Sequence, residues 1–511
     1  MRDPAIVEAR RVAQAALALY AEDPATSDEI RGYEARLQGP LRIALAGMVK
    51  AGKSTLLNAL LGEALAATDA GECTRVVTWY HRADVPTVTL HPREGAPRRL
   101  RFQRDGARTL IDLGDTTADE VDWIDVGWPS ESLRSLVLID TPGIASLSAD
   151  VSARARGYLT QRSSSASAAD AVIYLMRHLH ASDRGFLEAF RDVSVGGSLT
   201  VNAVAVLSRA DEVGSARIDS LVSAGQVARR YADDTELRSL VLDVVPVAGL
   251  LAETARTLRE DEYRALAEIA ALERSARERL LVSADRFANV AGVTSLGEAK
   301  RRELLTRFGL FGIRLSAALI RGGANSSTSL AEGLVQQSGL TTLQALVRDH
   351  FRGRADTLKV YGVLPGLEQL LRERPRRGSD ALLAEIERIL ATTHSLRELA
   401  ALSRTRAGGY PLPAERIAEA ERILGGSGDG AATRVGLGDG VGDDEVRRRV
   451  RELLARWREL AESPLTERAA VSLCHVVIRS LEQVAASPGG LISPRGGDPV
   501  GRLADDIVLP R

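Results

Sequence analysis

The chain has 511 residues, too many for a single core, so two or three domains are expected. Its formal net charge of −1 excludes a dominant nucleic-acid footprint, because such a surface would be clearly basic. The only cysteines, Cys73 and Cys474, lie far apart, so neither a disulfide framework nor a zinc pattern is expected. The N-terminus has no signal-peptide core, and no stretch reaches about 18 uninterrupted apolar residues. A cytoplasmic chain without a spanning helix is therefore expected.

Two helices are predicted before the first strand. Ala5–Tyr20 carries Ala, Leu and Val at helical spacing, and Asp23-Pro24 is expected to end it. Thr26–Glu29 fits a capping box that would start a second helix at Ile30–Leu37. These helices must pack on something, either as a lid on the domain that follows or in a bundle with later helices, and we expect a bundle with helices from residue 361 onward.

The stretch from Leu41 to Gly62 carries the most specific motif. An apolar strand is predicted over Leu41–Ala46 and a helix over Thr55–Leu61. Between them, Gly47–Ser54 reads G-M-V-K-A-G-K-S, a full match to the phosphate-binding loop G-x-x-x-x-G-K-[ST] in the strand–loop–helix context that it needs. Loop N–H groups and the helix N-terminus favour a bound triphosphate.

Several residues of this loop are candidate nucleotide contacts. Lys53 is expected to reach the β- and γ-phosphates, and Ser54 to bind Mg²⁺. The candidate contacts are Gly47, Lys50, Ala51, Gly52, Lys53, Ser54 and Thr55.

A second motif, Asp140-Thr-Pro-Gly143, follows the apolar run Leu136–Asp140. It matches D-x-x-G at the end of a buried strand. Asp140 is expected to hold the Mg²⁺ shell, and the N–H of Gly143 to sense the γ-phosphate. A plain turn is the alternative.

A third motif, Ser208–Asp211, occupies the place of [NT]-K-x-D after a strand predicted over Val201–Leu207. A carboxylate at Asp211 accepts hydrogen bonds from the guanine N1–H and N2 amino groups, which adenine does not present, so the base is predicted to be guanine. Arg209 would stack its planar guanidinium on that base. A solvated loop is the alternative.

Ala248 is a weaker candidate. It follows the last predicted strand, Val241–Val247, and its N–H could reach the base carbonyl, although a plain strand-to-helix turn explains it equally well.

Strands alternate with helices up to about residue 250, which predicts an open, mostly parallel α/β sheet with helices on both faces and the ligand at its switch point. After residue 252 strand signals nearly vanish and an all-α region is expected. The expected segments are N-terminal helices at 1–40, a GTPase core at 41–250, a helical extension at 251–360, a helical bundle (a neck or short stalk) at 361–486 and a disordered tail at 487–511.

Two stretches of the helical half have alternatives. Phe308–Ile320 is the most apolar piece; a core helix is expected because it is short and carries Arg314, and a membrane wedge is the alternative. Gly425–Gly442 is rich in Gly and Asp and is predicted to be a flexible loop.

In this order the motifs resemble those of bacterial dynamin-like GTPases. The chain looks closest to the actinobacterial group that includes the isoniazid-inducible dynamin-like proteins of mycobacteria, in particular the shorter type, and the likeness covers roughly residues 5–480. The segments that carry it are Gly47–Thr55, Leu56–Gly62, Thr74-Arg75, Asp140–Gly143, Ser208–Glu212, Arg307–Arg314 and the S-G-L segment at Ser338.

The resemblance implies GTP hydrolysis to GDP and phosphate with Mg²⁺, coupled to dimerisation of the G domains and to membrane remodelling or an envelope-stress response. Thr74 would be the switch I threonine that ligates Mg²⁺ and positions the attacking water. Another dynamin-like protein is a second candidate partner, peripheral contact with the inner face of the plasma membrane is a third, and nucleic acid is not expected.

A slow GTP-binding scaffold that partners a longer dynamin-like protein is the alternative function, favoured by the short helical half. No lipid-binding module is evident, so the trunk and membrane tip are expected to be reduced or absent. A ribosome-assembly GTPase is disfavoured by the neutral charge.

Lys50 stands where dynamins usually carry Ser or another polar residue, which helps to neutralise transition-state charge, in part through a monovalent cation. Guanylate-binding proteins, which dynamin-family GTPases resemble, have an Arg finger there. Lys50 is expected to supply that charge in cis. A solvated lysine that merely attracts phosphate is the alternative.

Overall fold

The computed structural model describes residues 3–66, 76–105, 108–113, 115–142, 169–193, 200–214, 217–290, 292–438 and 440–486. They divide into two compact units: the first holds residues up to 347 with 355–389, and the second holds 348–354 with the residues after 389. The domain boundaries expected at residues 40, 250 and 360 stay a prediction, because a compact unit need not be a segment that folds alone. The expected tail, 487–511, lies outside the described residues.

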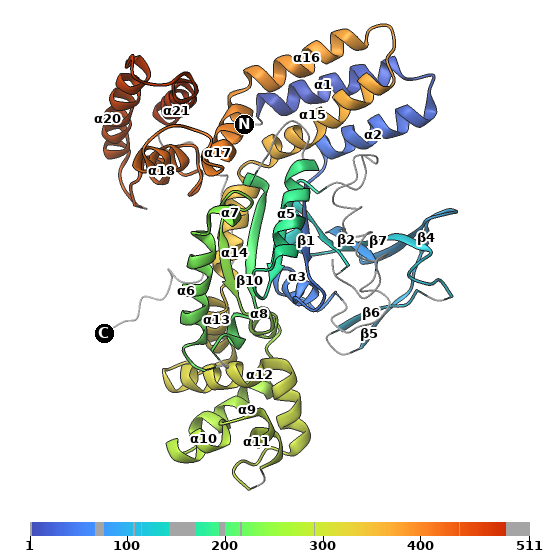
Figure 1. Cartoon of the computed structure of the whole chain (residues 1–511). Coiled ribbons are helices and arrows are strands. Elements are labelled where there is room, and N and C mark those ends of the chain that lie inside the picture. Colours follow the sequence, from blue (N-terminus) through green and yellow to red (C-terminus); the bar gives the residue numbers. More distant parts are fainter. Residues whose placement is uncertain are drawn as a thin grey trace, which may run out of the picture. The chain divides into compact units, whose positions relative to one another are not determined.

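A large sheet forms the core of the first unit (Figure 1). Within the described residues it has nine strands in the order β11-β10-β9-β1-β8-β2-β7-β3-β4. Most neighbouring pairs are parallel, which confirms the predicted α/β sheet. The strands are β1 (Leu41–Gly47), β2 (Val77–Arg82), β3 (Thr87–Pro92), β4 (Arg98–Arg99), β7 (Val121–Trp128), β8 (Leu136–Asp140), β9 (Ala171–Met176), β10 (Ala203–Ser208) and β11 (Val244–Val247).

The strand order reverses at β1, which lies between β9 and β8. Leu45 of β1 is opposite Ile173 on one side and Asp140 on the other. These central strands are continuous apolar runs, as parallel strands covered on both faces usually are. Since β1, β8, β9 and β10 run parallel, the loops that follow them leave from the same edge of the sheet, which is where ligands bind in open α/β folds.

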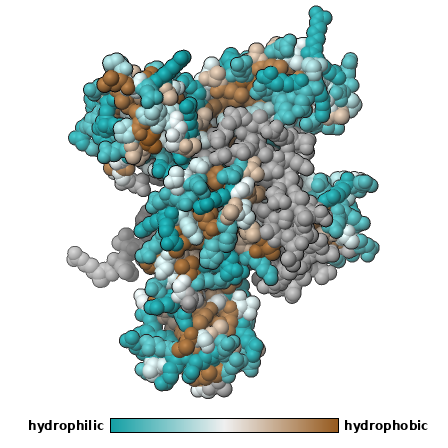
Figure 2. Space-filling view, viewed as in Figure 1, coloured by the Kyte–Doolittle hydropathy of each residue, from teal (hydrophilic) through white to brown (hydrophobic). Residues whose placement is uncertain are grey.

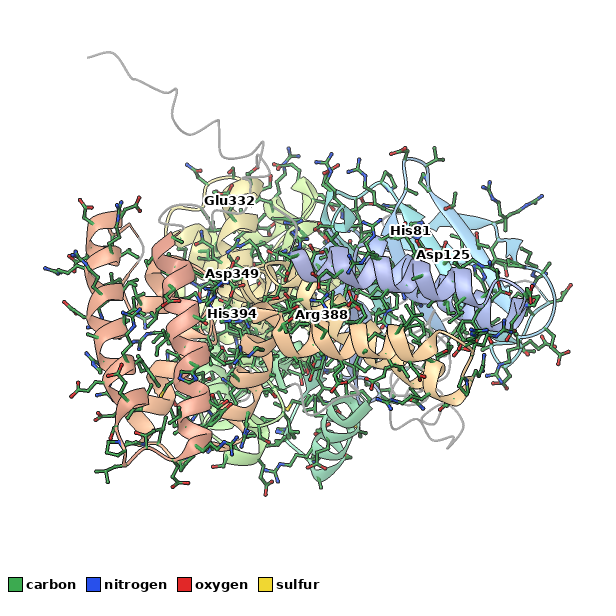
Figure 3. All side chains as sticks on the ribbon, turned by 90° about the horizontal axis from the view of Figure 1, so that it is seen from above. His81, Asp125, Glu332, Asp349, Arg388 and His394 are labelled. Atoms are coloured by element: carbon green, nitrogen blue, oxygen red, sulfur yellow. The ribbon has the colours of Figure 1, made fainter. Side chains whose placement is uncertain are left out.

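Beyond β8 the sheet is mixed: β2 runs antiparallel to β8 but parallel to β7, and β3 runs antiparallel to β7. His81 of β2 and Asp125 of β7 pair through Nδ1 and Oδ1 at 3.0 Å (Figure 3), and this hydrogen bond raises the pKa of His81. The pair stabilises the fold at low pH, and its contribution is lost as the pH rises through the raised pKa. A separate hairpin pairs β5 (Phe102–Asp105) with β6 (Arg108–Ile111).

Helices pack on this sheet. Phe186 and Leu187 of α5 and Ala224 of α6 join a buried cluster with Val172 and Tyr174 of β9. Helix α3, which follows the phosphate loop, contacts β1 and β8, and α8 packs beside α3. The helices are α3 (Lys53–Leu61), α5 (Ala181–Val193), α6 (Ser220–Ala232), α7 (Thr235–Arg238) and α8 (Gly249–Arg256), with short 3₁₀ turns η2 (Glu131–Leu133), η3 (Thr200–Asn202) and η4 (Ala210–Glu212).

A helical extension follows α8 and packs on it. It comprises α9 (Glu260–Ala271), α10 (Arg274–Leu280), α11 (Ala284–Asn289), α12 (Glu298–Arg321), α13 (Ser327–Gln337) and α14 (Leu340–Leu346). Helix α12 is kinked at Gly309, whose φ is 63°, so it consists of two helical segments that meet at this residue. Phe308, Phe311 and Ile313 are buried in the core of this extension, which confirms the core-helix prediction for Phe308–Ile320.

The two N-terminal helices lie beside two later helices (Figure 1). These are α1 (Pro4–Leu19), α2 (Pro24–Gln38), α15 (Ala355–Glu373) and α16 (Ser379–Thr392). Helix α15 packs on α1 and α2, and Arg388 of α16 donates to Glu8 of α1 at 3.0 Å (Figure 3).

The predicted start of the second helix was wrong. Helix α2 begins at Pro24 and not at Ile30, because Asp23 caps it: Asp23 accepts hydrogen bonds from the N–H of Thr26 at 3.1 Å and from its hydroxyl at 2.7 Å. Proline is favoured at the first helical position, where its missing N–H is not needed. Asp23-Pro24 therefore starts this helix in addition to ending the previous one.

The second unit consists of helices around a short π-helical segment of the chain. Its elements are η5 (Val347–Arg352), which begins one residue before the unit, α17 (His394–Arg406), α18 (Ala414–Ile423), α19 (Ala431–Val435), α20 (Asp443–Glu462) and α21 (Arg468–Ala486). Arg354 donates to the carbonyl oxygens of Leu424 and Gly425 at 2.8 and 3.0 Å and to Asp429 at 2.8 Å. The prediction of a flexible loop over Gly425–Gly442 was therefore wrong for two parts of the segment. Its first residues are held by the guanidinium of Arg354, and the helix α19 follows them.

Within the part of the chain that the structure describes, α21 is long and apolar enough to cross a bilayer by length and composition alone. Of its apolar window, 44% is buried inside the protein, and the helix packs on α17 and α20. An amphipathic core helix has the same properties. Figure 2 shows apolar residues scattered among hydrophilic ones on the face that it displays.

Candidate nucleotide-binding site

The phosphate-binding loop has the backbone that its glycines permit. Gly47 has φ 145°, and a Cβ there would lie 2.2 Å from the carbonyl oxygen of Leu175. Gly52 has φ 94° and is the N-cap of α3, so the first N–H groups of that helix open toward the loop. Helix α3 begins at Lys53, directly after the loop that follows the buried strand β1. This arrangement suits an anion at the helix N-terminus.

Lys53 lies under the loop and is nearly fully buried. Its ammonium donates to the carbonyl oxygens of Gly47 and Met48, each at 3.2 Å. Burial lowers the pKa of Lys53, and the nearby carboxylate of Asp140 opposes that change. The buried ammonium has lost its hydration and has two neutral carbonyl oxygens as partners. A phosphate would stabilise it further, because an anion binds an ammonium more strongly than a neutral carbonyl does.

Ser54 and Asp140 meet at the end of β8. The Ser54 hydroxyl donates to Asp140 Oδ2 at 2.8 Å, and burial raises the pKa of Asp140. The other oxygen, Oδ1, is buried and has no hydrogen-bond partner among the described residues. A buried carboxylate oxygen without a donor usually has a ligand or ion to satisfy it.

These groups fit Mg²⁺. The hydroxyl of Ser54 and the carboxylate of Asp140 are oxygen donors, and Mg²⁺ prefers few protein ligands together with phosphate oxygens and water. In the part of the chain that the structure describes, no group of three or more His, Cys, Asp or Glu side chains could hold a metal alone. A magnesium ion held by these two residues would leave its other positions to phosphate oxygens and water.

A pocket opens beside the loop, where a base would lie. It is lined by Ala51, Gly52, Thr55, Leu56, Leu175, Val206, Ser208, Arg209, Asp211, Glu212, Val247, Gly249 and Leu250. Burial raises the pKa of the Asp211 carboxyl at this pocket. The Ser208 hydroxyl donates to the carbonyl oxygen of Met176 at 3.2 Å and so joins the ends of β10 and β9.

Arg209 links the base-binding loop to the phosphate-binding loop. Its φ is 53°, and its Nη2 donates to the Lys50 carbonyl oxygen at 3.3 Å. Glu212 holds the same guanidinium at 2.7 Å and also accepts from Arg177 at 2.8 Å. Glu212 was not a predicted site residue, although it directly follows the S-R-A-D motif. Lys50 has φ 60° and an exposed side chain.

The structure corrects the expectation for Ala248. Its N–H donates to the carbonyl oxygen of Ser338 at 2.9 Å, so it is not available to a base carbonyl. The neighbouring residues Val247, Gly249 and Leu250 line the pocket, whereas Ala248 is fully buried behind them.

Two predicted site residues, Thr74 and Gly143, lie outside the described residues. The structure does show what holds the chain shortly before Thr74. Asn58 of α3 is buried; its side-chain oxygen accepts from the N–H groups of Leu65 and Ala66 at 2.9 and 2.7 Å, and its amide donates to Glu253 of α8 at 2.9 Å. In the sequence Asn58 is only one residue of the Leu56–Gly62 segment, and nothing local reveals these partners.

Comparison with known proteins agrees with this geometry. Residues 43–189 match the model of the dynamin family. The chain is 39% identical over 453 residues to the isoniazid-induced protein IniC of Mycobacterium tuberculosis. The matched region covers 88% of this chain and 91% of that protein.

Two further likenesses are lower. The bacterial dynamin-like protein of Nostoc punctiforme is 28% identical over 217 residues, covering 40% of this chain and 29% of that protein. The solved structure of an oligomerised bacterial dynamin pair covers 95% of this chain and 76% of its own, at 13% identity and a TM-score of 0.29, too low to bear on function. The extent and identity of the match to IniC show that the chain belongs to the bacterial dynamin-like proteins, in the group of the isoniazid-induced proteins.

Proposed function

We propose that this chain hydrolyses GTP to GDP and phosphate with Mg²⁺. One observation carries the proposal. Lys53, the Ser54–Asp140 pair and the pocket of Asp211 lie along one edge of the sheet, so a phosphate group, a magnesium ion and a guanine base could bind as one ligand. Membership of the dynamin family supports it, because the G domain of that family is a GTPase domain in general.

The residues have separate roles in this proposal. Lys53 would exchange its contacts with two carbonyl oxygens for the β- and γ-phosphates. Ser54 and Asp140 would hold Mg²⁺, with Thr74 as the expected third protein ligand. The bound ion would supply charge neutralisation at the phosphates. Positioning and charge account for most catalysis of phosphoryl transfer, and Gly143 would add its N–H at the γ-phosphate.

The first experiment measures phosphate release from GTP and ATP by the purified chain with and without Mg²⁺. We expect release from GTP only, and only with Mg²⁺. Lys53→Ala should abolish it, because no other buried ammonium lies under the loop among the described residues. Lys300→Ala is the matched control: Lys300 pairs with Asp261 and Glu303 in the helical extension, and its loss should leave turnover unchanged. Equal turnover of ATP would contradict the proposal.

Lys50 is the proposed internal finger. The side chain of Lys50 is exposed, and its backbone has the left-handed conformation. Arg209, from the base-binding loop, donates a hydrogen bond to the Lys50 carbonyl oxygen and so helps to fix the backbone conformation of this residue. An Arg finger contributes several powers of ten to turnover. A lysine has the same single charge but lacks the planar guanidinium that can donate two parallel hydrogen bonds, so it would contribute less.

The test of Lys50 compares Lys50→Ala with the unchanged chain in Na⁺, K⁺ and choline buffers. We expect kcat to fall by about tenfold or more, with turnover of the unchanged chain independent of the cation. An unchanged kcat in Lys50→Ala would leave Lys50 as a solvated residue that attracts phosphate.

We further propose that turnover is coupled to dimerisation of the G domains and to membrane remodelling or an envelope-stress response, with the chain at the inner face of the membrane. Family membership supports this. Light scattering after size exclusion with GDP, GTP and a transition-state mimic tests dimerisation, which is expected with the mimic. Sedimentation with liposomes should show only weak binding by the chain alone.

A slow GTP-binding scaffold that partners a longer dynamin-like protein is the second candidate. Its support is the similarity to a second protein, the isoniazid-induced protein IniA. The two chains are 33% identical over 120 residues, which cover only 18% of IniA, so IniA is a distinct dynamin-like protein that could be such a partner. The concentration dependence of kcat separates the two functions. A kcat that rises with protein concentration favours self-activation, whereas a slow and flat kcat favours the scaffold.

A further inference from the structure

One wall of the base pocket is made by the turn between β11 and α8. Val247, Gly249 and Leu250 line the pocket on this side. Ala248, the N-cap of α8, is fully buried behind them and turns its N–H away from the pocket. The position of this wall therefore depends on what lies behind Ala248.

The residues behind it are Ser338 and Gly339, some ninety positions further along the chain. The N–H of Ala248 donates to the Ser338 carbonyl oxygen at 2.9 Å. Gly339 has φ 80°, and a Cβ placed on it would lie 2.1 Å from the carbonyl oxygen of Pro246 and 3.5 Å from the Cα of Val247. Two backbone segments thus touch where no side chain fits.

The turn is itself held rigidly at the junction of α13 and α14. The N–H of Ser338 donates to the Leu334 carbonyl oxygen at 2.9 Å, and its hydroxyl donates to Val335 at 2.7 Å. The same hydroxyl accepts from the N–H of Leu340 at 3.2 Å. All the hydrogen-bonding groups of Ser338 are therefore occupied within the turn or by Ala248, and the residue is 1% exposed.

The helical extension also packs on the rest of this wall. Leu330 and Leu334 of α13 share a buried cluster with Ala248 and Leu251 of α8. Helix α14 contacts β11 and α3, the helix that follows the phosphate-binding loop. A shift of α13 or α14 would consequently be felt at the pocket, because close-packed interiors transmit displacement.

We propose that the Ser338–Gly339 turn is a positioning element for guanine nucleotide, through which the helical extension sets the place of the base-binding wall. The inference rests on the proposed function, since it takes the pocket to hold a guanine base. It concerns affinity, because the contacts of the turn within the described residues are with the wall beside the base and not with Lys53, Ser54 or Asp140.

Gly339→Ala is the test variant. The added Cβ would lie 2.1 Å from the Pro246 oxygen, well inside the 3.0 Å below which real Cβ contacts essentially never occur, so the wall or the turn must shift by about an ångström. Gly292→Ala is the matched control: Gly292 lies in the same helical extension, has φ 79°, and its added Cβ meets nothing within 4 Å in the described structure. Both variants carry the same left-handed strain, and only one pushes on the wall.

Affinity for fluorescent GDP and steady-state GTP turnover are measured for both. We expect Gly339→Ala to weaken GDP binding and raise KM by about tenfold or more, with kcat at saturating GTP within about threefold. Gly292→Ala should bind GDP within about twofold of the unchanged chain. Amide exchange over residues 244–256 should rise in Gly339→Ala alone, since its Ala248 N–H loses the Ser338 acceptor.

If Gly339→Ala does not fold, Ser338→Ala decides. It removes the two hydroxyl hydrogen bonds but keeps the carbonyl, so a smaller loss of GDP affinity in the same direction is expected. GDP binding by Gly339→Ala or, in that case, Ser338→Ala equal to that of Gly292→Ala would overturn the inference while leaving the proposed function intact. Failure of the unchanged chain to bind guanine nucleotide would instead overturn the proposed function, and the inference with it.

Discussion

At the scale of single residues, we propose that Asp211 decides which base the pocket accepts. Its carboxylate would accept hydrogen bonds from the two donors of guanine, and burial would make it costly to leave the carboxylate without them. We predict that Asp211→Asn weakens GDP binding by about a hundredfold and strengthens binding of xanthosine diphosphate, because the amide offers one donor and one acceptor, as xanthine does. Titration of both nucleotides at one pH measures the change.

The pH dependence of binding is the control on this assignment. Burial raises the pKa of Asp211, so its carboxylate is protonated at a higher pH than an exposed aspartate. Only the ionised form accepts both guanine donors. GDP affinity should therefore fall as the pH is lowered through this raised pKa, and the fall should be absent in Asp211→Asn. An identical pH profile in the two proteins would remove Asp211 from base recognition.

At the scale of elements, a buried ion pair joins α2 to the sheet. Arg36 and Asp170 are 3% and 1% exposed, and Nη2 of Arg36 lies 2.8 Å from Oδ1 of Asp170. The other carboxylate oxygen accepts from the N–H of Arg42 in β1 at 2.9 Å. Asp170 directly precedes β9, so this pair fastens the N-terminal helices to two central strands.

Breaking this pair should be costly. We predict that Arg36→Met lowers the free energy of unfolding by about 3–5 kcal/mol, because it leaves the Asp170 charge buried with one remaining neutral donor. Arg31→Met is the control on the same helix: its partner Asp28 and Arg31 itself are exposed, and exposed pairs contribute about 0–1 kcal/mol. Urea denaturation measures both, and equal losses would contradict the assigned role.

At the scale of the whole molecule, the chain has two compact units, and Arg354 is a central group of the second. It ties residues 348–354 to the Leu424–Asp429 turn through the carbonyl oxygens of Leu424 and Gly425 and the carboxylate of Asp429. Asp429→Asn weakens that contact without changing the volume of the side chain, so it should act on the second unit alone.

We predict two thermal transitions, of which GDP raises only the one that belongs to the nucleotide-binding unit. Asp429→Asn should lower the other transition by several degrees and leave GDP affinity unchanged. Arg348→Met, which removes an exposed arginine from the same segment, is the control for this variant. A single transition that GDP raises as a whole would show that the units unfold together.

Local chemistry was sufficient for much of the fold. The strand Leu136–Asp140 has the bounds of the apolar run that the sequence shows, because it is a continuous run of apolar residues that ends at Asp140. The phosphate-binding loop was predictable for the same reason, since its function depends on backbone angles and on side chains within eight consecutive positions.

The sequence by itself therefore determined the sheet, the loop of Gly47–Ser54, the family and the expectation of guanine at Asp211. Only the tertiary structure decided that Ala248 donates to Ser338, that Asn58 donates to Glu253, and that Arg354 donates to Gly425. The physical reason is distance along the chain. A motif is a property of neighbouring residues, whereas these contacts join backbone and buried polar groups whose partners are fixed only when separate helices pack.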